Sequence, residues 1–525
     1  MTSDVQQARI DALTGALAQR DAALKIAHLT IDKLKLEVSY LRRMQYGRAS
    51  EKLEHGGQLE LMDSGIAPKP AANDAPISDD ASHGQAGNKR STKPRSGLRD
   101  LPAHLPRQTV VHDPQGGCNC AECGKGLRVI GQDVSEVLDY EPGNFLVVRH
   151  VRPKLACGAC QSIVQAPAPS RPVDRALAGA GLMAHVLVSK YADHTPLHRQ
   201  SQIYARDGVD LAVSTLADIV AGTAWLLTPL AQALGRYVLG GAKVHGDDTP
   251  IRVLGGAASR AKTGRLWVYV RDDRASGDMA PPAVWFQYSA DRRGEHPRRH
   301  LRNFQGILQA DAFAGYDRLF DDGRIVEAAC WSHARRKFYD IHEHQRKMPG
   351  TLAHEALQRI AAIFAIEADI QGQLPDERMR QRRLRTRPRL DELQRWLTDT
   401  LAQVSAKSPM ALAIGYVMSN WRALTRFVDD GRMEAHNNIA ERALRTVALG
   451  RKNFLHLGSD SGGERAAVIY SLLGSAKLIG LNPRAYLRHV LDRIAEHPIN
   501  RIDELLPWAV ADQIDTVRLP QRQAA

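Results

Sequence analysis

The sequence predicts a multidomain α+β protein. We expect an N-terminal coiled-coil helix, a small zinc-binding module, a helical segment like a helix-turn-helix, and an α/β domain with a helical insertion. Three observations predict this plan: a heptad repeat over residues 8–44, two Cys-x-x-Cys pairs between residues 120 and 160, and five strand-like segments between residues 243 and 331. With 525 residues the chain is long enough for several domains and at least one sizeable core.

The overall charge favours a polyanionic partner. The formal net charge is +13 and the pI is about 9.5, for which nucleic acid is the usual partner, although the same charge also serves plain solubility. No run approaches the ~18 consecutive apolar residues that span a bilayer. The N-terminus lacks the basic-then-apolar plan of a signal peptide. We therefore expect a cytoplasmic protein without a membrane partner.

Residues 8–44 keep an unbroken heptad, which is typical of a coiled coil. The a positions are Ile10, Leu17, Leu24, Ile31 and Val38, and the d positions are Leu13, Arg20, Ala27, Leu34 and Leu41. Arg20 weakens the N-terminal half of this seam. We expect a zipper helix over residues 1–55 that joins copies of the chain into a homo-oligomer. The alternative is a helix that packs on its own domain.

A polar segment follows at residues 63–100. It is rich in Pro, Ala, Ser, Asp and Gly and holds no large aromatic residue. Such a segment cannot bury enough apolar surface to offset its ordering entropy, so we expect a flexible linker. Its basic end, "NKRSTKPRSGLR", is suited to contact a phosphate backbone, and a solvated tail fits equally well.

Cysteine pairs predict a zinc-binding module over residues 101–170. Cys120 and Cys123 form one Cys-x-x-Cys pair, and Cys157 and Cys160 form the other. Two such pairs can close a zinc tetrahedron, and the gap between them is longer than in common zinc ribbons. Cys118 is an alternative ligand. A redox pair or unused thiols are the other interpretations, while disulfides are disfavoured in a reducing cytosol.

Residues 171–240 read as helices. The stretch "AGAGLMAHVLVSKYAD" is followed by "TPLHRQSQIYARDG", in which Gly208 ends a helix, and then by "STLADIVAGTAWLLTPLAQAL". A helix, a glycine-containing turn and a second helix fit a DNA-binding helix-turn-helix, and generic helical packing fits nearly as well.

The five strand-like segments lie within residues 241–340, and two of them carry an aspartate that is a candidate metal ligand. The first three favour an antiparallel meander, which the later two extend. Asp247 lies in the first strand, and Asp311 lies where the fourth leaves the sheet. After largely helical residues 341–435, a second part of the domain at 436–480 contains a helix that Asn438 is expected to cap and that carries Glu441. Residues 481–525 form a C-terminal segment.

Three carboxylates from two strands and one helix suffice to hold two Mg²⁺ ions through oxygen ligands. Each also has a simpler explanation. Asp247 and its neighbour Asp248 are compatible with a turn before Pro250, and Asp311 with a helix cap. Glu441 is compatible with a capping carboxylate or an ion pair with Arg445 one turn on.

Long segments, in order along the chain, resemble the insertion-sequence-66 (IS66) family of bacterial transposases. They are "YLRRMQYGRASEKL" in the zipper region, "IGQDVSEVLDY" and "VRHVRPKLACGAC" in the cysteine module, "KYADHTPLHRQSQIYARDGVDLAVSTLADIV" in the helical segment, "HGDDTPIRVL", "TGRLWVYVRDDR" and "LQADAFAGYDRL" in the strands, and "NNIAERALRTVALGRKNFLHLGSDSGGERAAVIYSLLGSAKLIGLNPRAYL" near the C-terminus. The resemblance covers most of the chain.

This resemblance implies a ribonuclease-H-like catalytic domain with an Asp-Asp-Glu (DDE) triad at Asp247, Asp311 and Glu441. It implies Mg²⁺ or Mn²⁺ at the triad, structural zinc, double-stranded DNA as the partner, and accessory proteins of the same mobile element, in a bacterial nucleoid-associated setting. The sequence departs from the family pattern twice. Asp248 replaces the usual glutamate, and His436 stands where the family commonly has aspartate.

Further residues are expected near the triad. The stretch "CWSHARRKF" resembles a Cys-x-x-His element of related transposases, so Cys330 and His333 are expected either to bind zinc or, preferably, to pack and orient the site. Four cations that follow Glu441 are expected to bind DNA or to form a solvated face: Arg442, Arg445, Arg451 and Lys452. The clusters "DRRGEHPRRHLR" and "RMRQRRLRTRPR" extend this expected DNA surface.

The expected function is metal-dependent cleavage and transfer of DNA strands at the terminal inverted repeats of an insertion sequence. A zinc-containing DNA-binding regulator without catalysis would explain the charge, the heptads and the cysteines, but not the three spaced carboxylates. A ribonuclease-H-like nuclease that cuts without joining would share the triad.

Zinc at Cys120, Cys123, Cys157 and Cys160 is a first prediction. Metal analysis of the purified protein should find about one zinc per chain, since one tetrahedral site takes four thiolates. Replacing Cys120 by Ser should unfold the module and weaken DNA binding, with the catalytic carboxylates unaffected. A clearly lower zinc content in the native protein contradicts the tetrahedral site.

Overall fold

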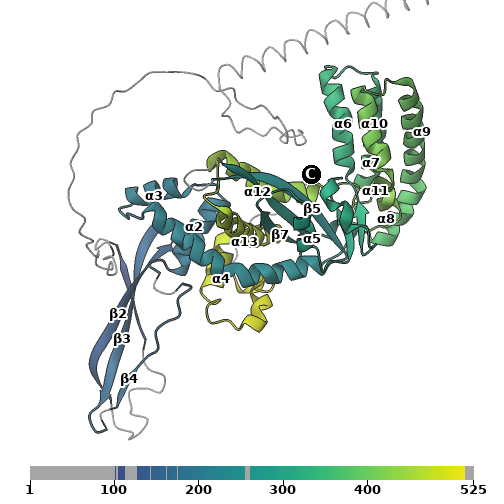
Figure 1. The fold of residues 1–525 in the computed structure, drawn as a ribbon. Helices are drawn as coiled ribbons and strands as arrows, with labels where there is room; N and C mark the ends of the chain where they lie inside the picture. The colour runs from purple at the N-terminus through teal and green to yellow at the C-terminus, as the bar shows by residue number, and fades with distance from the viewer. Residues whose placement is uncertain are drawn as a thin grey trace, which may run out of the picture. The chain divides into compact units, whose positions relative to one another are not determined.

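A computed structural model of the protein describes residues 101, 105–112, 127–141, 143–160, 162–173, 176–254 and 261–514 (Figure 1). The predicted zipper helix, the predicted linker, and Cys118, Cys120 and Cys123 lie outside these residues. Two compact units divide the chain, residues 1–94 and 95–525, and all described residues belong to the second.

A mixed five-stranded sheet forms the centre of the described chain. Its strands are β5 (Lys243–Val253), β6 (Lys262–Arg271), β7 (Ala283–Ser289), β8 (Gly306–Gln309) and β9 (Ile325–Ala328). Their spatial order is β7-β6-β5-β8-β9. The first three strands pair antiparallel, whereas β5, β8 and β9 are parallel. The predicted antiparallel meander is therefore confirmed, and the mixed sheet agrees with the ribonuclease-H-like domain that the family resemblance implies.

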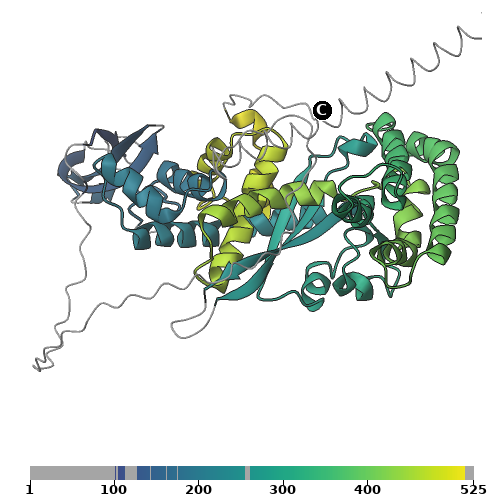
Figure 2. The same cartoon turned by 90° about the horizontal axis from the view of Figure 1, so that it is seen from above.

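Helices cover the sheet and close its outer edge. The long helix α4 (Val213–Leu239) packs on β7, and so does α13 (Asp460–Leu478), in both views of the molecule (Figures 1 and 2). On α13 the hydroxyl of Ser471 accepts from the Phe286 N–H at 2.8 Å, and that of Ser475 from the Val284 N–H at 3.0 Å. Because β7 is an edge strand, these serines cover backbone donors that would otherwise be open to pairing with another strand.

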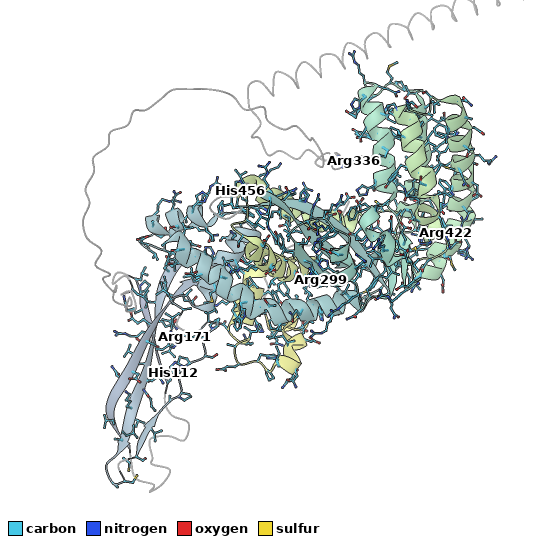
Figure 3. All side chains as sticks on the ribbon, in the orientation of Figure 1. His112, Arg171, Arg299, Arg336, Arg422 and His456 are labelled. Atoms are coloured by element: carbon cyan, nitrogen blue, oxygen red, sulfur yellow. The ribbon has the colours of Figure 1, made fainter. Side chains whose placement is uncertain are left out.

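A four-stranded sheet precedes the helices in the sequence. The second pair of predicted zinc ligands, Cys157 and Cys160, lies at the end of its third strand and in the turn that follows. The strands of this sheet are β1 (Arg107–Val111), β2 (Leu127–Glu141), β3 (Asn144–Cys157) and β4 (Ile163–Gln165), with β3 paired to the other three. Gly143, with φ +86°, turns β2 into β3. His112, labelled in Figure 3, follows β1, and its Nε2 lies 3.0 Å from Nδ1 of His150 on β3.

Three helices connect this sheet to the central one, in agreement with the three helical stretches expected from the sequence. They are α2 (Ala180–Tyr191), α3 (Leu197–Arg206) and α4. Gly208, with φ +79°, does follow the end of α3, as predicted. Alone among the described helices, α4 is long and apolar enough to cross a membrane by length and composition. Most of its apolar residues lie in the protein core, which accounts for that composition, although Trp225 is 78% exposed.

A helical insertion lies between the fifth strand and the helix that carries Glu441. Its helices are α6 (Trp331–His344), α7 (Leu352–Asp369), α8 (Pro375–Gln381), a π-helical turn (Arg382–Thr386), α9 (Arg387–Gln403), α10 (Pro409–Ser419) and α11 (Trp421–Thr425). Helices α6, α7, α9 and α10 lie side by side in both views (Figures 1 and 2). They share a second hydrophobic core, which reaches the sheet at Ile307 and Ala328.

The remaining elements complete the central domain. They are α5 (Glu295–His300), α12 (Asn438–Asn453), α14 (Pro483–Leu491), and 3₁₀ turns at Arg274–Ser276, Ala314–Leu319, Arg426–Val428, Ile499–Leu505 and Ala511–Gln513. Helix α12 packs on β5 and β6. The predicted cap at Asn438 is wrong by one residue, because α12 begins at Asn438 and Asn437 occupies the cap position without a side-chain cap bond.

A buried ionic network joins the insertion to the sheet. Glu434 accepts from Arg378 at 3.0 Å and lies 3.6 Å from Lys243 Nζ, and all three side chains are almost fully buried. Arg382 donates to Glu367 on α7 at 2.6 Å. Burial acts to raise the pKa of Glu434, but Lys243 and Arg378 outweigh it and lower that pKa below its ordinary value.

This network corrects the prediction that "RMRQRRLRTRPR" forms a DNA surface. Two of its arginines, Arg378 and Arg382, are buried in the network. The other five pair with carboxylates: Arg380 with Glu377, Arg383 and Arg387 with Asp429, Arg385 with Asp369, and Arg389 with Glu392. The sequence shows the arginines but not which carboxylates the fold places beside them.

Replacing Glu434 by Gln should destabilise the protein by about 3 kcal/mol, since it removes the buried carboxylate that Lys243 and Arg378 share. Each cation keeps a contact with another carboxylate, 3.5 Å from Lys243 to Asp273 and 3.8 Å from Arg378 to Glu367. Urea unfolding of the full chain measures this change. Glu377→Gln is the matched control, because Glu377 pairs with Arg380 at the fully exposed surface and should leave the midpoint unchanged. Equal midpoints for both variants would show that the buried network contributes no stability.

Candidate active site

Strand register brings Asp247 and Asp311 together. In the parallel pair β5–β8, His245 is aligned with Gln309. Each aspartate lies two residues further along its chain, at the carboxyl end of the pairing. Because residues two apart point to the same face of a strand, both carboxylates leave the same face of the sheet. The fold thus juxtaposes two acids that are 64 residues apart in the sequence, counted from 247 to 311.

The neighbouring aspartates of β5 have opposite environments because successive side chains alternate between faces. Asp248 is 1% exposed and accepts from Arg265 at 2.9 Å and from Arg292 at 2.8 Å. Asp247 lies on the other face. It accepts only from the Asp248 backbone N–H, at 2.7 Å, among the described residues. Asp248 is therefore neutralised by two guanidinium groups, whereas Asp247 is not.

Burial and repulsion from neighbouring acids raise the pKa values of Asp247 and Asp311. Burial, followed by the nearby charge of Asp311, raises the pKa of Asp247 well above its ordinary value, and Glu441 adds to this effect. Burial also raises the pKa of Asp311, against the opposing charges of His333 and Arg292. One oxygen of Asp311, Oδ1, is buried without a hydrogen-bond partner. Such a group suits a bound cation, because leaving a buried carboxylate oxygen without a partner is costly.

A buried asparagine holds Glu441 against these two aspartates. Asn437 is completely buried just before α12. Its Nδ2 donates to the Gly246 carbonyl at 2.8 Å, and its Oδ1 lies 3.0 Å from His245 Nδ1, both on β5. Its backbone N–H donates to the sulfur of Cys330 at 3.1 Å. Asn437 thus fixes the start of the helix that carries Glu441 to the strand that carries Asp247.

Cys330 and His333 lie beside Glu441, as the sequence predicted. His333 Nδ1 is 3.7 Å from Glu441 Oε1, and the donor atoms of all three residues lie within 4.8 Å of one another. Burial raises the pKa of Cys330 to about 12, so it is a neutral thiol that accepts backbone N–H groups. This environment suits packing and orientation better than zinc binding. Glu441 forms its ion pair with His333, and Arg445 does not pair with it among the described side chains.

Arg292 lies beside the three carboxylates and was not singled out from the sequence. It contacts Asp248, lies 3.8 Å from Asp311, and stacks on the ring of Phe313 at 3.9 Å. Its side chain is still 38% exposed, so part of the guanidinium faces solvent at the site. The only sequence signal was its place in the basic cluster "DRRGEHPRRHLR". Asn437 was missed as well, because a pair of asparagines before a helix is read first as a cap.

The four cations predicted to follow Glu441 divide into two groups. Arg442, Arg445 and Lys452 are exposed on α12 and are available to an external anion. Arg451 is half-buried and donates to the Pro250 carbonyl on β5. Burial lowers the pKa of Arg451, and its role in the described chain is to tie α12 to the sheet. The side chain of Arg336 projects from α6, the helix that also carries His333 (Figure 3).

The three carboxylates fit divalent metal ions. Oxygen ligands from Asp247, Asp311 and Glu441 are of the kind Mg²⁺ and Mn²⁺ prefer, and the unpartnered Asp311 oxygen has no competing donor. Of the predicted zinc ligands, Cys157 ends β3 and Cys160 lies in the following turn. Cys157 is aligned with Leu127, which is four residues after Cys123 in the sequence. A four-residue chain spans at most about 14 Å, which is compatible with one shared zinc site.

Comparisons with known proteins agree with this geometry. Residues 175–465 match the model of the "Transposase IS66 family", residues 471–508 its "IS66 C-terminal element", and residues 118–161 the "zinc-finger binding domain of transposase IS66". Residues 33–110 match "Transposase C of IS166 homeodomain". Matching relatives in Sinorhizobium fredii are the uncharacterized proteins y4hP, 38% identical over 90% of this chain and 88% of the relative, and y4jD, 37% identical over 93% and 97%.

Crowding of acids at the site predicts a pH-dependent effect of Asp247 on stability. Its folded pKa is raised, so its contribution to stability is greatest below the unfolded pKa and is lost as the pH rises through the folded pKa. In metal-free buffer, Asp247→Asn should therefore raise the thermal midpoint at about pH 8, and the gain should shrink toward about pH 4.

Differential scanning calorimetry of the full chain with chelator measures these midpoints. Adding Mg²⁺ should favour the native protein and reverse the order, since ligand binding stabilises the folded state. Asp317→Asn, an exposed carboxylate on the following 3₁₀ turn, is the control. A gain at Asp247 that does not change with pH would contradict the repulsive cluster.

Proposed function

The chain belongs to the IS66 family of DDE transposases, which are polynucleotidyl transferases, and we propose that Asp247, Asp311 and Glu441 are its catalytic acids. In this proposal it cuts DNA at the ends of its own insertion sequence and joins them to a target. The single observation that carries the assignment is the convergence of these residues from β5, from the end of β8 and from α12 on one buried position.

The proposed chemistry is two successive exchanges at phosphorus. A water molecule attacks a phosphodiester at the element end, its proton is lost to solvent, and the released strand carries a 3′-hydroxyl. That hydroxyl then attacks a phosphodiester of the target, whose own 3′-oxygen leaves. When bound, Mg²⁺ or Mn²⁺ would lower the pKa of the attacking water or hydroxyl and stabilise the negative charge on the leaving oxygen.

The chain's own residues position the substrate. Asp247, Asp311 and Glu441 would hold the metal ions, with Asn437 keeping their two elements in register. Arg292 is well placed to contact a phosphate oxygen, because it is anchored by Asp248 and still partly exposed. Arg442, Arg445 and Lys452 extend a cationic face along α12 for the DNA backbone. Phosphoryl transfer depends mostly on such positioning and charge neutralisation.

The other modules would supply binding and assembly. We assign zinc to the two Cys-x-x-Cys pairs of the matched zinc-finger domain, and DNA contact to the helical segment α2–α4. The heptad of residues 8–44 would join chains so that one assembly holds both element ends. Accessory proteins of the same element and a cytoplasmic, nucleoid-associated location belong to this proposal. A regulator without catalysis does not account for the three convergent carboxylates, and a cutting nuclease is distinguished by its inability to join strands.

Asp247→Asn, Asp311→Asn and Glu441→Gln should each lower Mg²⁺-dependent strand cleavage by about a thousandfold or more. The loss of metal binding removes several kcal/mol of transition-state stabilisation, and each 1.36 kcal/mol is a factor of ten. Binding to a duplex that carries the element's end should remain near native, because it depends on distributed cationic contacts. Cleavage and strand transfer on labelled duplexes, with binding by fluorescence anisotropy, measure both.

Asp248→Asn is the matched control on the same strand. Asp248 is paired with Arg265 and Arg292 and is not a proposed metal ligand, so Asp248→Asn should lower cleavage less than the triad variants do, through the weaker anchoring of Arg292. Strand transfer retained in Asp247→Asn, or lost only in Asp248→Asn, would mean that the wrong aspartate is assigned. Full activity in Glu441→Gln would reduce that residue to a partner of His333. Cleavage by the native protein without any joining would identify a nuclease.

A further inference from the structure

Helix α3 is anchored to the protein by two buried polar residues. Gln200 donates to the backbone carbonyls of Thr195 at 2.9 Å and Val186 at 3.3 Å. The hydroxyl of Tyr204 donates to Gln200 Oε1 at 3.0 Å, and its ring meets Phe145 of β3 edge to face, with 5.2 Å between centroids. These contacts fix the rotation of α3 about its own axis and therefore determine which of its side chains face outward.

A tight turn makes α3 the second helix of a helix pair. Residues 192–196 connect α2 to α3, with His194 in the left-handed region at φ +59°. The Thr195 N–H donates to the Ser189 carbonyl at 2.7 Å and closes the turn onto α2. Two helices joined by a short turn, the first largely buried and the second exposed, have the arrangement of a DNA-binding helix-turn-helix. The sequence had suggested the pair around Gly208 instead.

The outward face of α3 carries side chains that hydrogen-bond to base edges. Its exposed residues are His198, Arg199, Gln202, Ile203, Ala205 and Arg206, spaced so that they share one side of the helix. None of the four polar side chains among them makes a hydrogen bond or ion pair with another described residue. By contrast, the arginines between Arg378 and Arg389 are all paired with acids. The backbone of α3 thus fixes where these side chains lie, and they remain available to an external partner.

We propose that α3 enters the major groove of the element's terminal repeat and reads its sequence. This inference rests on the proposed function, since the DNA end is the substrate of the reaction. Arginine pairs bidentately with guanine, glutamine does so with adenine, and an aliphatic side chain contacts the thymine methyl group. Arg199, Gln202 and Ile203 supply one of each within a single turn of α3.

Charge and chemistry favour DNA over a protein partner. The face carries two arginines and no carboxylate, and Asp207 and Asp210 lie beyond the end of the helix. An interface for protein would be expected to centre on large apolar or aromatic residues, whereas Ile203 is the one large apolar side chain on this face and is only 38% exposed. A cationic, hydrogen-bonding surface on a fixed helix matches a groove lined by phosphates and base edges.

The test compares full-length Arg199→Ala, Arg199→Lys and Gln202→Ala with the native chain. Anisotropy at fixed salt measures binding to a duplex with the element's own terminal repeat and to a scrambled duplex of the same length. Each variant should lose about tenfold to a hundredfold in affinity for the repeat and stay within about threefold on the scrambled duplex. Arg199→Lys keeps the charge but not the bidentate fork, so it should fall with Arg199→Ala.

Single base-pair substitutions across the repeat localise the contact. Native protein should discriminate at a short run of adjacent positions, and each variant should lose discrimination at one of them. Arg395→Ala, an exposed arginine on α9, is the control and should bind as the native chain does. Thermal melting confirms that the exposed substitutions leave the fold intact.

Three outcomes would overturn the proposal: native discrimination in all variants, an equal loss on both duplexes, or native binding to DNA without preference for the repeat. An equal loss on both duplexes would reduce α3 to a phosphate contact. Each outcome is distinguishable from failure of the proposed function, which is the absence of Mg²⁺-dependent cleavage by the native chain. Variants that bind DNA normally but fail to capture a protein of the same element would identify α3 as a protein interface.

Discussion

The active site depends on holding three acids of like charge together, with Asp247 buried and Asp311 and Glu441 partly buried. Such a cluster opposes folding, as the raised pKa values of Asp247 and Asp311 record. It is maintained because the residues before α12 are fastened to the sheet at several points. Gln309 and the backbone of Glu434 exchange hydrogen bonds, and Asn437 bonds to both His245 and the Gly246 carbonyl. The rest of the fold supports this segment, since Glu434 is itself anchored by the insertion through Arg378.

This arrangement gives the helical insertion a structural purpose. It separates Asp311 from Glu441 along the chain by a long stretch of helices with a core of their own. Its buried arginines and Lys243 converge on the segment that returns to the sheet, so the insertion and the third acid are mechanically coupled. A free loop of equal length would leave Glu441 to sample many positions. The insertion instead delivers it to one position, and the cost of burying charge is offset by pairing each cation.

Sequence reasoning correctly predicted those structural features that the pattern of a single strand or helix determines. Alternating apolar residues predicted the sheet, and Asp247 in the first strand lies near Asp311 after the fourth because β5 and β8 are parallel neighbours. Sequence reasoning failed where residues far apart in the sequence pair. The arginines of 378–389 were expected on a DNA surface. Arg380 and Arg389 pair with the nearby Glu377 and Glu392, but the acids of the others come from α7 and from residues 429–434, which no local pattern reveals. Asn437 was invisible for the same reason, since its partners on β5 are about 190 residues away.

The positive net charge therefore overestimates how much cationic surface is available to bind DNA. Many of the described arginines pair with carboxylates, whereas α12 and α3 each carry exposed arginines that pair with no described carboxylate. The two helices are not independent. Tyr191, at the end of α2, meets Tyr470 of α13 edge to face, and Thr446 of α12 donates to the Tyr191 carbonyl at 3.4 Å. Because α3 follows α2 through a closed turn, the proposed reading helix and the helix of Glu441 are joined through packed residues rather than a linker. Recognition of a DNA end by α3 would then set the position of the strand at the three carboxylates, so that specificity and positioning come from the same rigid path.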